Sequence, residues 1–320
     1  MIEFLFLIIG LFGLWLGSEV LMRGAMALSD RFAASDALFG MIVLAIGTDL
    51  PELFVAVDAS VRSLGGEDLS GIVIGSAVGS SIGQFGLVFG TAGFIGFQAM
   101  RHRCLSRNAI FLVGSIVSLG LCCVDGQLSR LEGVLLMLYY ASYLFVLIRS
   151  RADSPDASQS STGLGLDKAW ALLAVGLLIL WASAKLTVAS AVDFAALIGL
   201  SNIAVSAIII GIGSSLPEVS VSFMALVKKR GALSVGNLIG SNILDTLLVP
   251  GLAAVISPLV VPVSVVYIDL PVLLLITVTV LFCLYVSRRG IHKPEAMFLL
   301  TVYLAYAVVR LSDPAFGMLH

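Results

Sequence analysis

AIGTDLPE at residues 45–52 and GIGSSLPE at residues 211–218 are two versions of one motif. A second pair of similar segments follows, GSAVGSSIGQFGLVFG at 75–90 and GNLIGSNILDTLLVPG at 236–251. Self-similarity of this kind within one chain is typical of an internally repeated architecture. The sequence is therefore predicted to fold as two structurally related halves.

The composition argues against a soluble protein. Of the 320 residues, 59% are hydrophobic and only 12% are charged, whereas soluble domains carry about 25% charged residues. So few charges cannot cover the water-facing surface of a chain of this size. The net charge of −2 gives no basic footprint for a nucleic-acid partner. The sequence predicts an integral membrane protein that is surrounded by the lipid bilayer.

Ten apolar segments are long enough to cross a bilayer, which needs about 20 apolar residues per helix. They are 2–22, 37–62, 70–98, 106–124, 130–148, 168–192, 202–227, 232–257, 262–286 and 293–311. Several exceed the usual length, so we expect them to tilt, bend or break. Pro51 and Pro217 lie near the middles of the second and seventh segments, where proline removes a backbone hydrogen bond and kinks a helix.

The two halves are expected to have opposite orientations in the membrane. Residues 1–149 and residues 168–320 hold five spans each, and the polar segment 150–167 links them. An odd number of spans inserts the second half upside down. We therefore predict an all-α membrane protein with ten transmembrane helices arranged as two inverted five-helix repeats. Such repeats are typical of transporters, with the substrate site near the midplane.

The basic residues predict which side of the membrane each loop faces. Most of the 18 lysines and arginines fall in one set of loops and span ends, and only Arg62, Arg130, Lys185 and Arg310 fall in the other. By the positive-inside rule the first set is cytoplasmic. We expect a multi-pass protein of the cell (inner) membrane with both termini outside the cytoplasm.

Polar side chains gather in the two repeated motifs, inside the predicted spans. Residues three or four apart share one face of a helix. Four pairs have this spacing in spans two, seven, three and eight: Asp49 and Glu52, Ser215 and Glu218, Ser80 and Gln84, and Ser241 and Asp245. Four carboxylates, one amide and several hydroxyls are thus presented from four helices.

Four acids within a membrane are best explained as a cation site. Hydrogen bonding between helices would explain the serines, but a buried charge without a partner costs several kcal/mol, and no basic residue lies at that depth in these spans. Calcium takes 6–8 oxygen ligands from carboxylates, amides and carbonyls. The interpretation requires transported inorganic cations as partners, and neither a cofactor nor a catalytic residue.

Three other acids are given simpler roles. Glu19 lies four residues before Arg23, so we expect a surface ion pair. Asp36 follows a serine at the start of span two and is interpreted as a helix cap. Asp269 lies toward the outer part of span nine, where a place in an ion vestibule stays open as an alternative.

With these features the chain resembles the calcium/cation antiporter superfamily, most closely the sodium/calcium exchangers of prokaryotic size. The resemblance covers essentially the whole chain. It rests on the ten spans, the two inverted repeats, a G-[TS]-x-L-P-E motif in each half, and the paired motifs GSSIGQ (79–84) and GSNILD (240–245).

The resemblance implies roles for ten residues. Glu52 and Glu218 would be the central calcium ligands, and Thr48 and Ser214 would lend backbone carbonyls. The remaining matching ligand positions are Asp49, Ser80, Gln84, Ser215, Ser241 and Asp245. The implied function is secondary-active exchange of Ca²⁺ for Na⁺ by alternating access, in which spans one and six slide across a fixed central site.

Two residues depart from the family's usual pattern. Asp49 stands where the family usually has serine, and Gln84 where asparagine or aspartate is common. Because one calcium ion neutralises only half the charge of four carboxylates, we expect at least one acid to hold a proton. Proton-coupled exchange of Ca²⁺ or another divalent cation, or a changed sodium stoichiometry, therefore stays open.

Two other classes of membrane protein, an intramembrane protease and a passive channel, explain these residues less well than an exchanger does. An intramembrane aspartyl protease would need two facing aspartates and typically a G-x-G-D motif, which is absent. Such a protease would also leave Glu52 and Glu218 unexplained. A passive channel would conduct without a counter-ion, and four crowded acids bind a cation too tightly for rapid conduction. The oligomeric state is left open.

Overall fold

The computed structural model describes residues 2–32, 35–66, 69–95, 102–149, 164–197, 215–286 and 290–311. Eight helices in these ranges are long and apolar enough to cross a membrane. The prediction of an all-helical membrane protein is therefore confirmed. The seventh expected span is described only from Ser215 onward, and the ten-span inverted arrangement stays a prediction.

The helices largely follow the predicted segments. The first half contains α1 (Ile2–Arg31), α2 (Asp36–Phe39), α3 (Ala45–Ser63), α4 (Ser70–Gly83), α5 (Gly90–Ile95), α6 (His102–Cys122) and α7 (Arg130–Arg149). The second half contains α8 (Leu166–Leu197), α11 (Leu216–Val227), α12 (Gly231–Ile256), α13 (Leu270–Val286) and α14 (Lys293–Leu311).

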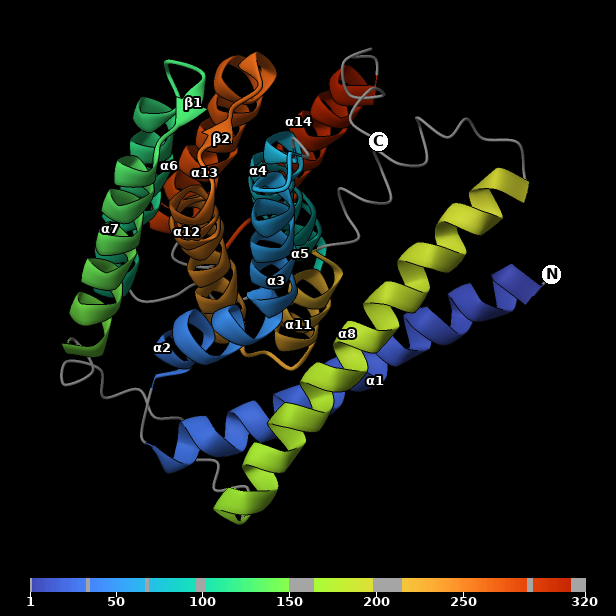
Figure 1. Cartoon of the computed structure of the whole chain (residues 1–320). Coiled ribbons are helices and arrows are strands. Elements are labelled where there is room, and N and C mark those ends of the chain that lie inside the picture. The colour runs from blue at the N-terminus through green and yellow to red at the C-terminus, as the bar shows by residue number, and fades with distance from the viewer. Residues whose placement is uncertain are drawn as a thin grey trace.

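Helices α1 and α8 form a long pair that runs obliquely beside the remaining helices (Figure 1). At 30 residues, α1 is longer than the predicted 2–22 segment, and Glu19 and Arg23 pair along it. The two backbones approach closely. A Cβ atom on Gly176 of α8 would lie 2.5 Å from the backbone nitrogen of Leu21, so only glycine fits there without displacing α1.

Helix α12 is the central element of the other group of helices. Nearly all of its side chains are buried, and it contacts α3, α4, α6, α7 and α11. The packing against the second span is again set by glycine, because a Cβ atom on Gly240 would lie 2.5 Å from the carbonyl oxygen of Met41. The ends of α12 and α6 are joined by a short antiparallel ribbon of β1 (Gln127–Leu128) and β2 (Leu259–Val260).

Among the described residues, three spans contain π-helical segments, which are η1 (Gly40–Leu44), η2 (Gln84–Phe89) and η5 (Val265–Asp269). Such segments widen a helix locally and occur frequently at functional sites. Pro51 lies inside α3. Pro217 does not lie in the middle of a helix as expected. Helix α11 begins at Leu216, so the proline lies in its first turn, where a missing N–H costs no intrahelical hydrogen bond.

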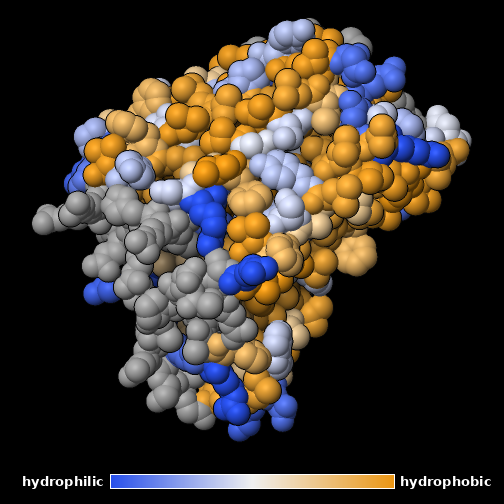
Figure 2. Space-filling view, turned by 90° about the vertical axis from the view of Figure 1, so that its left-hand side faces the viewer, coloured by the Kyte–Doolittle hydropathy of each residue, from blue (hydrophilic) through white to orange (hydrophobic). Residues whose placement is uncertain are grey.

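The outer surface is suited to lipid. Figure 2 shows a flank on which apolar side chains predominate. On α7, for example, Leu131, Leu138 and Phe145 are each at least 60% exposed. A soluble protein seldom exposes so many large apolar side chains, so this surface supports the assignment to a membrane.

Candidate cation site

The predicted site residues that the structure describes come from five neighbouring elements and are all buried. They are Thr48, Asp49 and Glu52 on α3, Ser80 on α4 with Gln84 at the start of η2, Ser215 and Glu218 at the start of α11, and Ser241 and Asp245 on α12. Glu52 is the most exposed acid, at 6%. Ser214 lies outside the described residues.

Two hydrogen bonds between predicted site residues join the two halves of the site, and a third lies within the first half. The hydroxyl oxygens of Ser80 and Ser215 are 2.6 Å apart, which links α4 to α11. The amide nitrogen of Gln84 donates to Ser80 Oγ over 3.0 Å and to Asp245 Oδ2 over 3.4 Å. The repeated motifs are therefore neighbours in space as well as relatives in sequence.

The four carboxyl groups form one electrostatic cluster. Asp49 lies beside Glu218 and Ser241, and Glu52 and Asp245 both interact with Asp49 through their charges. Because these groups carry the same charge and are shielded from water, they repel one another when ionised. The cluster is unfavourable unless protons or cations neutralise it.

The carboxylate oxygens are largely without hydrogen-bond partners. As ionised carboxylates, Asp49, Glu52 and Glu218 have two buried oxygens each without a hydrogen-bond partner, and Asp245 has one, Oδ1. Within the described ranges, no lysine, arginine or histidine forms an ion pair with any of them. Buried polar oxygens are rarely left unsatisfied in a folded protein, so these seven atoms are suited to binding a cation.

The acids alone do not make a compact metal centre. In the part of the chain that is described, no three Asp, Glu, His or Cys side chains are grouped closely enough to hold a metal ion. A bound cation would therefore also need hydroxyl or main-chain oxygens. The hydroxyl of Thr48 already donates to the carbonyl of Leu44 over 3.1 Å, so its hydrogen is used within its own span.

Two further polar side chains of α12 were not identified from the sequence, and one of them contacts the site. Asn242 of α12 donates to Gln84 Oε1 over 3.0 Å, and Thr246 donates to Ser115 of α6 over 2.8 Å. Asn242 lies within the GSNILD motif, so its position in that motif was the available signal. These contacts tie η2 and α6 to the central helix α12.

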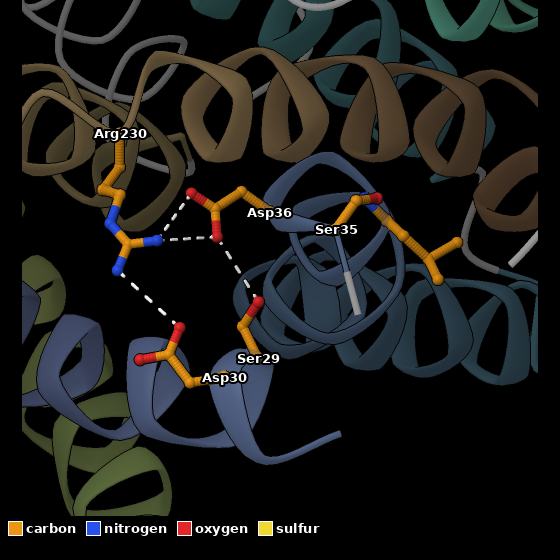
Figure 3. Close-up of polar contacts among 6 residues, drawn as sticks. Ser29, Asp30, Ser35, Asp36 and Arg230 are labelled. Carbon is orange, nitrogen blue, oxygen red and sulfur yellow. Dashed lines mark hydrogen bonds and ion pairs between the residues drawn. The ribbon is translucent and has the colours of Figure 1, made fainter. Parts of the chain in front are cut away.

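A separate group of ion pairs joins the end of α1 to the turn between α11 and α12 (Figure 3). Nη1 of Arg230 lies 2.9 Å from both carboxylate oxygens of Asp36, and the guanidinium is 3.9 Å from Asp30. The prediction that Asp36 caps its helix is wrong. Ser35 is the cap, with its hydroxyl oxygen accepting from the backbone N–H of Leu38, which leaves the Asp36 carboxylate to bind Arg230.

The other two acids also have basic partners. The predicted pair of Glu19 and Arg23 is confirmed at 2.9 Å, and Lys228 joins it at 2.7 Å. Asp269 is buried beneath the surface and lies 3.2 Å from the Nε atom of Arg310. Asp269 is thus part of a buried ion pair, which is a sufficient reason for an acid at that depth.

Comparison with known proteins gives matches over nearly the whole chain. The family described as sodium/calcium exchanger protein matches residues 2–149 and 168–312. The putative antiporter CaxA of Alkalimonas amylolytica is 28% identical, over 97% of this chain and 98% of its own. The sodium/calcium exchanger MaX1 of Methanosarcina acetivorans is also 28% identical, over 96% of this chain and 98% of its own.

A solved structure has the same fold. A structure of the sodium-calcium exchanger NCX_Mj soaked with 2.5 mM Na⁺ and 0.1 mM Ca²⁺ superimposes with a TM-score of 0.81 at 25% sequence identity. The match covers 98% of this chain and 99% of the other. The similarity therefore extends over all the elements that carry the cluster of acids.

Proposed function

Because this chain belongs to the sodium/calcium exchanger protein family, we propose that it exchanges Ca²⁺ for Na⁺ across the membrane as a secondary-active antiporter. The observation that carries the proposal is the buried cluster of Asp49, Glu52, Glu218 and Asp245, seven of whose eight carboxylate oxygens have no hydrogen-bond partner. Such a cluster has a physical reason to exist if cations occupy it during the transport cycle.

The chemistry of the cluster suits hard cations. Carboxylate and hydroxyl oxygens are the ligand type that Ca²⁺ prefers, and a divalent ion relieves the repulsion among the acids. Sodium ions would use the same oxygens. When calcium and sodium compete for one set of ligands, occupancy by one ion excludes the other, and exchange follows without covalent chemistry. We propose no catalytic residue and no cofactor.

Alternating access needs one part of the protein to move across the other. We propose that α1 and α8 move as a unit, since they pack along each other and lie obliquely beside the remaining helices (Figure 1). The acids lie on α3, α11 and α12, which contact one another. The site would then stay fixed while the α1–α8 pair opens it to one side at a time.

We propose a multi-pass protein of the cell membrane with both termini outside and the turn containing Lys229 in the cytoplasm. The basic residues of that turn and of the end of α1 support this orientation. A membrane-impermeant maleimide tests it on intact cells, in a background without the four native cysteines. Gln127→Cys, at the exposed position of β1, should be labelled and Lys229→Cys should not. Labelling of Lys229→Cys alone would reverse the topology.

Calcium uptake into proteoliposomes tests the exchange itself. Uptake should follow an imposed sodium gradient and should be absent without a counter-ion gradient. Uptake driven only by a pH gradient would make the proton the counter-ion. Uptake without any counter-ion gradient would indicate a channel, and no uptake under either gradient would overturn calcium as the substrate.

A further inference from the structure

The orientation of one amide in the site is fixed by a second amide beside it. Asn242 Nδ2 donates to the carbonyl oxygen of Leu238 over 2.9 Å. A carbonyl oxygen only accepts hydrogen bonds, so the nitrogen of Asn242 must face it. The same nitrogen donates to Gln84 Oε1 over 3.0 Å. The oxygen of Gln84 is therefore held toward Asn242.

The nitrogen of Gln84 consequently faces the oxygens of the site. Its two hydrogens have two acceptors, Ser80 Oγ at 3.0 Å and Asp245 Oδ2 at 3.4 Å. Gln84, Asn242, Ser80 and Asp245 are all completely buried. Because water does not reach the network, none of these hydrogen bonds is readily exchanged for a bond to solvent.

An amide nitrogen cannot ligate a cation, because it donates hydrogen bonds and accepts none. The N–H groups of Gln84 bring partial positive charge to the oxygens of Ser80 and Asp245 that a metal ion would use. We propose that the inward-facing nitrogen of Gln84 excludes a cation from this corner of the site. Asn242 is the positioning residue that keeps the nitrogen of Gln84 turned inward.

The two halves of the protein differ at this point. Ser81 stands in the GSSIGQ motif where Asn242 stands in GSNILD, and its hydroxyl has no hydrogen-bond partner. Asp245, at the place equivalent to Gln84, keeps its Oδ1 free of hydrogen bonds. The first half thus contributes a donor and the second an acceptor. Cation binding is expected to concentrate on Oδ1 of Asp245 and the three other acids.

The inference rests on the proposed function for its choice of ions, but its test measures binding rather than transport. Asn242→Leu removes the donor that holds Gln84 Oε1, so the amide can turn its oxygen toward Ser80 and Asp245. Asn237→Leu is the matched control. Asn237 is an equally buried asparagine of α12 that donates to Ser222 instead. Both variants make the same replacement, of an uncharged amide by an uncharged apolar side chain.

The measurement is a sodium titration of purified protein in detergent, followed through the melting temperature. We expect Asn242→Leu to lower the sodium concentration for half-maximal stabilisation by roughly threefold to tenfold, and Asn237→Leu to leave it unchanged. The double variant Asn242→Leu/Gln84→Leu should not bind sodium more tightly than the wild type, since residue 84 then has no oxygen that can turn toward the site. A loss of packing alone would not tighten sodium binding.

A second variant tests the role of Gln84 if Asn242→Leu does not fold. Gln84→Glu replaces the nitrogen by an oxygen at almost the same size, and we expect it to tighten sodium binding and to raise the Hill coefficient. Unchanged or weaker sodium binding in both Asn242→Leu and Gln84→Glu would overturn the inference. Failure of the wild type to take up calcium would overturn the proposed function, while the sodium titration would still decide the role of Gln84.

Discussion

Gln84 and Asp245 stand at the same place in the two repeated motifs, and their side chains meet with 3.4 Å between Nε2 and Oδ2. The contact joins residues 161 positions apart in the chain, so the two motifs face each other at this point. The pair is unequal, because one member is a neutral amide and the other a carboxylate. The negative charge of the site is therefore weighted toward α3, α11 and α12.

Replacing either glutamate of the cluster should prevent calcium transport. Glu52→Gln and Glu218→Gln keep the size of the side chain and remove its charge. We expect each to reduce sodium-driven calcium uptake in proteoliposomes by at least roughly tenfold, because calcium affinity depends on the number of charged ligands. Ser60→Ala is the control, since Ser60 is buried on the same helix without a hydrogen-bond partner. Retained exchange in both glutamine variants would remove these acids from the site.

Calcium should stabilise the folded protein. The oxygens of Asp49, Glu52 and Glu218 have no hydrogen-bond partner, so a bound ion both relieves repulsion and satisfies buried atoms. At about 100 times its Kd, a ligand stabilises the folded state by about 2.7 kcal/mol. We expect a calcium-dependent rise in the melting temperature in detergent and its reversal by a chelator. An equal calcium-dependent rise in the melting temperature of Glu218→Gln would indicate that calcium binds outside the cluster of acids.

The four acids of the candidate site stand out in the sequence, because burying a carboxylate within an apolar span costs free energy. A carboxylate in an apolar span has few explanations, so Glu52 and Glu218 draw attention without any structure. The orientation of Gln84 could not be predicted. It depends on Asn242, which lies 158 positions away in the chain, and a motif shows which residue types are present without showing which atom of an amide faces inward.

The same limit applies to Asp36 and to the irregular helices. The sequence shows a serine and an aspartate at a helix start, and either can cap. Arg230, 194 positions away, determines that Asp36 binds a guanidinium. The π-helical turns at Gly40–Leu44 and Gln84–Phe89 have no hydrophobic period of their own.

The contact of Arg230 with Asp36 should stabilise the junction between α1, α2 and the α11–α12 turn. Arg230→Ala removes two charge-assisted hydrogen bonds, both 2.9 Å long. Since hydrogen bonds to charged groups are worth about 1.5–3 kcal/mol, we expect a lower melting temperature. Lys229→Gln, a change at an exposed neighbour, should have little effect. Additive effects of Arg230→Ala and Asp36→Ala in a double-mutant cycle would show that the two side chains do not interact.

The close approach of α1 and α8 should tolerate no side chain at Gly176. A Cβ atom there would lie 2.5 Å from the backbone nitrogen of Leu21, so Gly176→Ala must push the helices apart. Overpacking of this kind costs about 1–3 kcal/mol. Gly75→Ala is the matched control, because a Cβ atom on Gly75 of α4 meets nothing within 4 Å, and alanine favours a helix. Equal melting temperatures for the two variants would contradict the observed packing.

The ion pair of Asp269 and Arg310 should be structural rather than part of the ion path. The two side chains are buried, 3.2 Å apart, with Tyr306 beside both. Arg310→Leu leaves the Asp269 charge buried without this partner, and removing one member of a buried pair costs about 3–5 kcal/mol. The double variant Asp269→Leu/Arg310→Leu removes both charges and should recover much of the lost stability.

Transport distinguishes this role from a place in an ion vestibule. If the pair only holds η5 to α14, the double variant should take up calcium with the same sodium dependence as the wild type, because the acids of the site lie on α3, α11 and α12. Uptake per folded molecule is the quantity to compare. A double variant that folds, as judged by its melting temperature, and yet needs several-fold more sodium for half-maximal uptake would put Asp269 on the path of the ion.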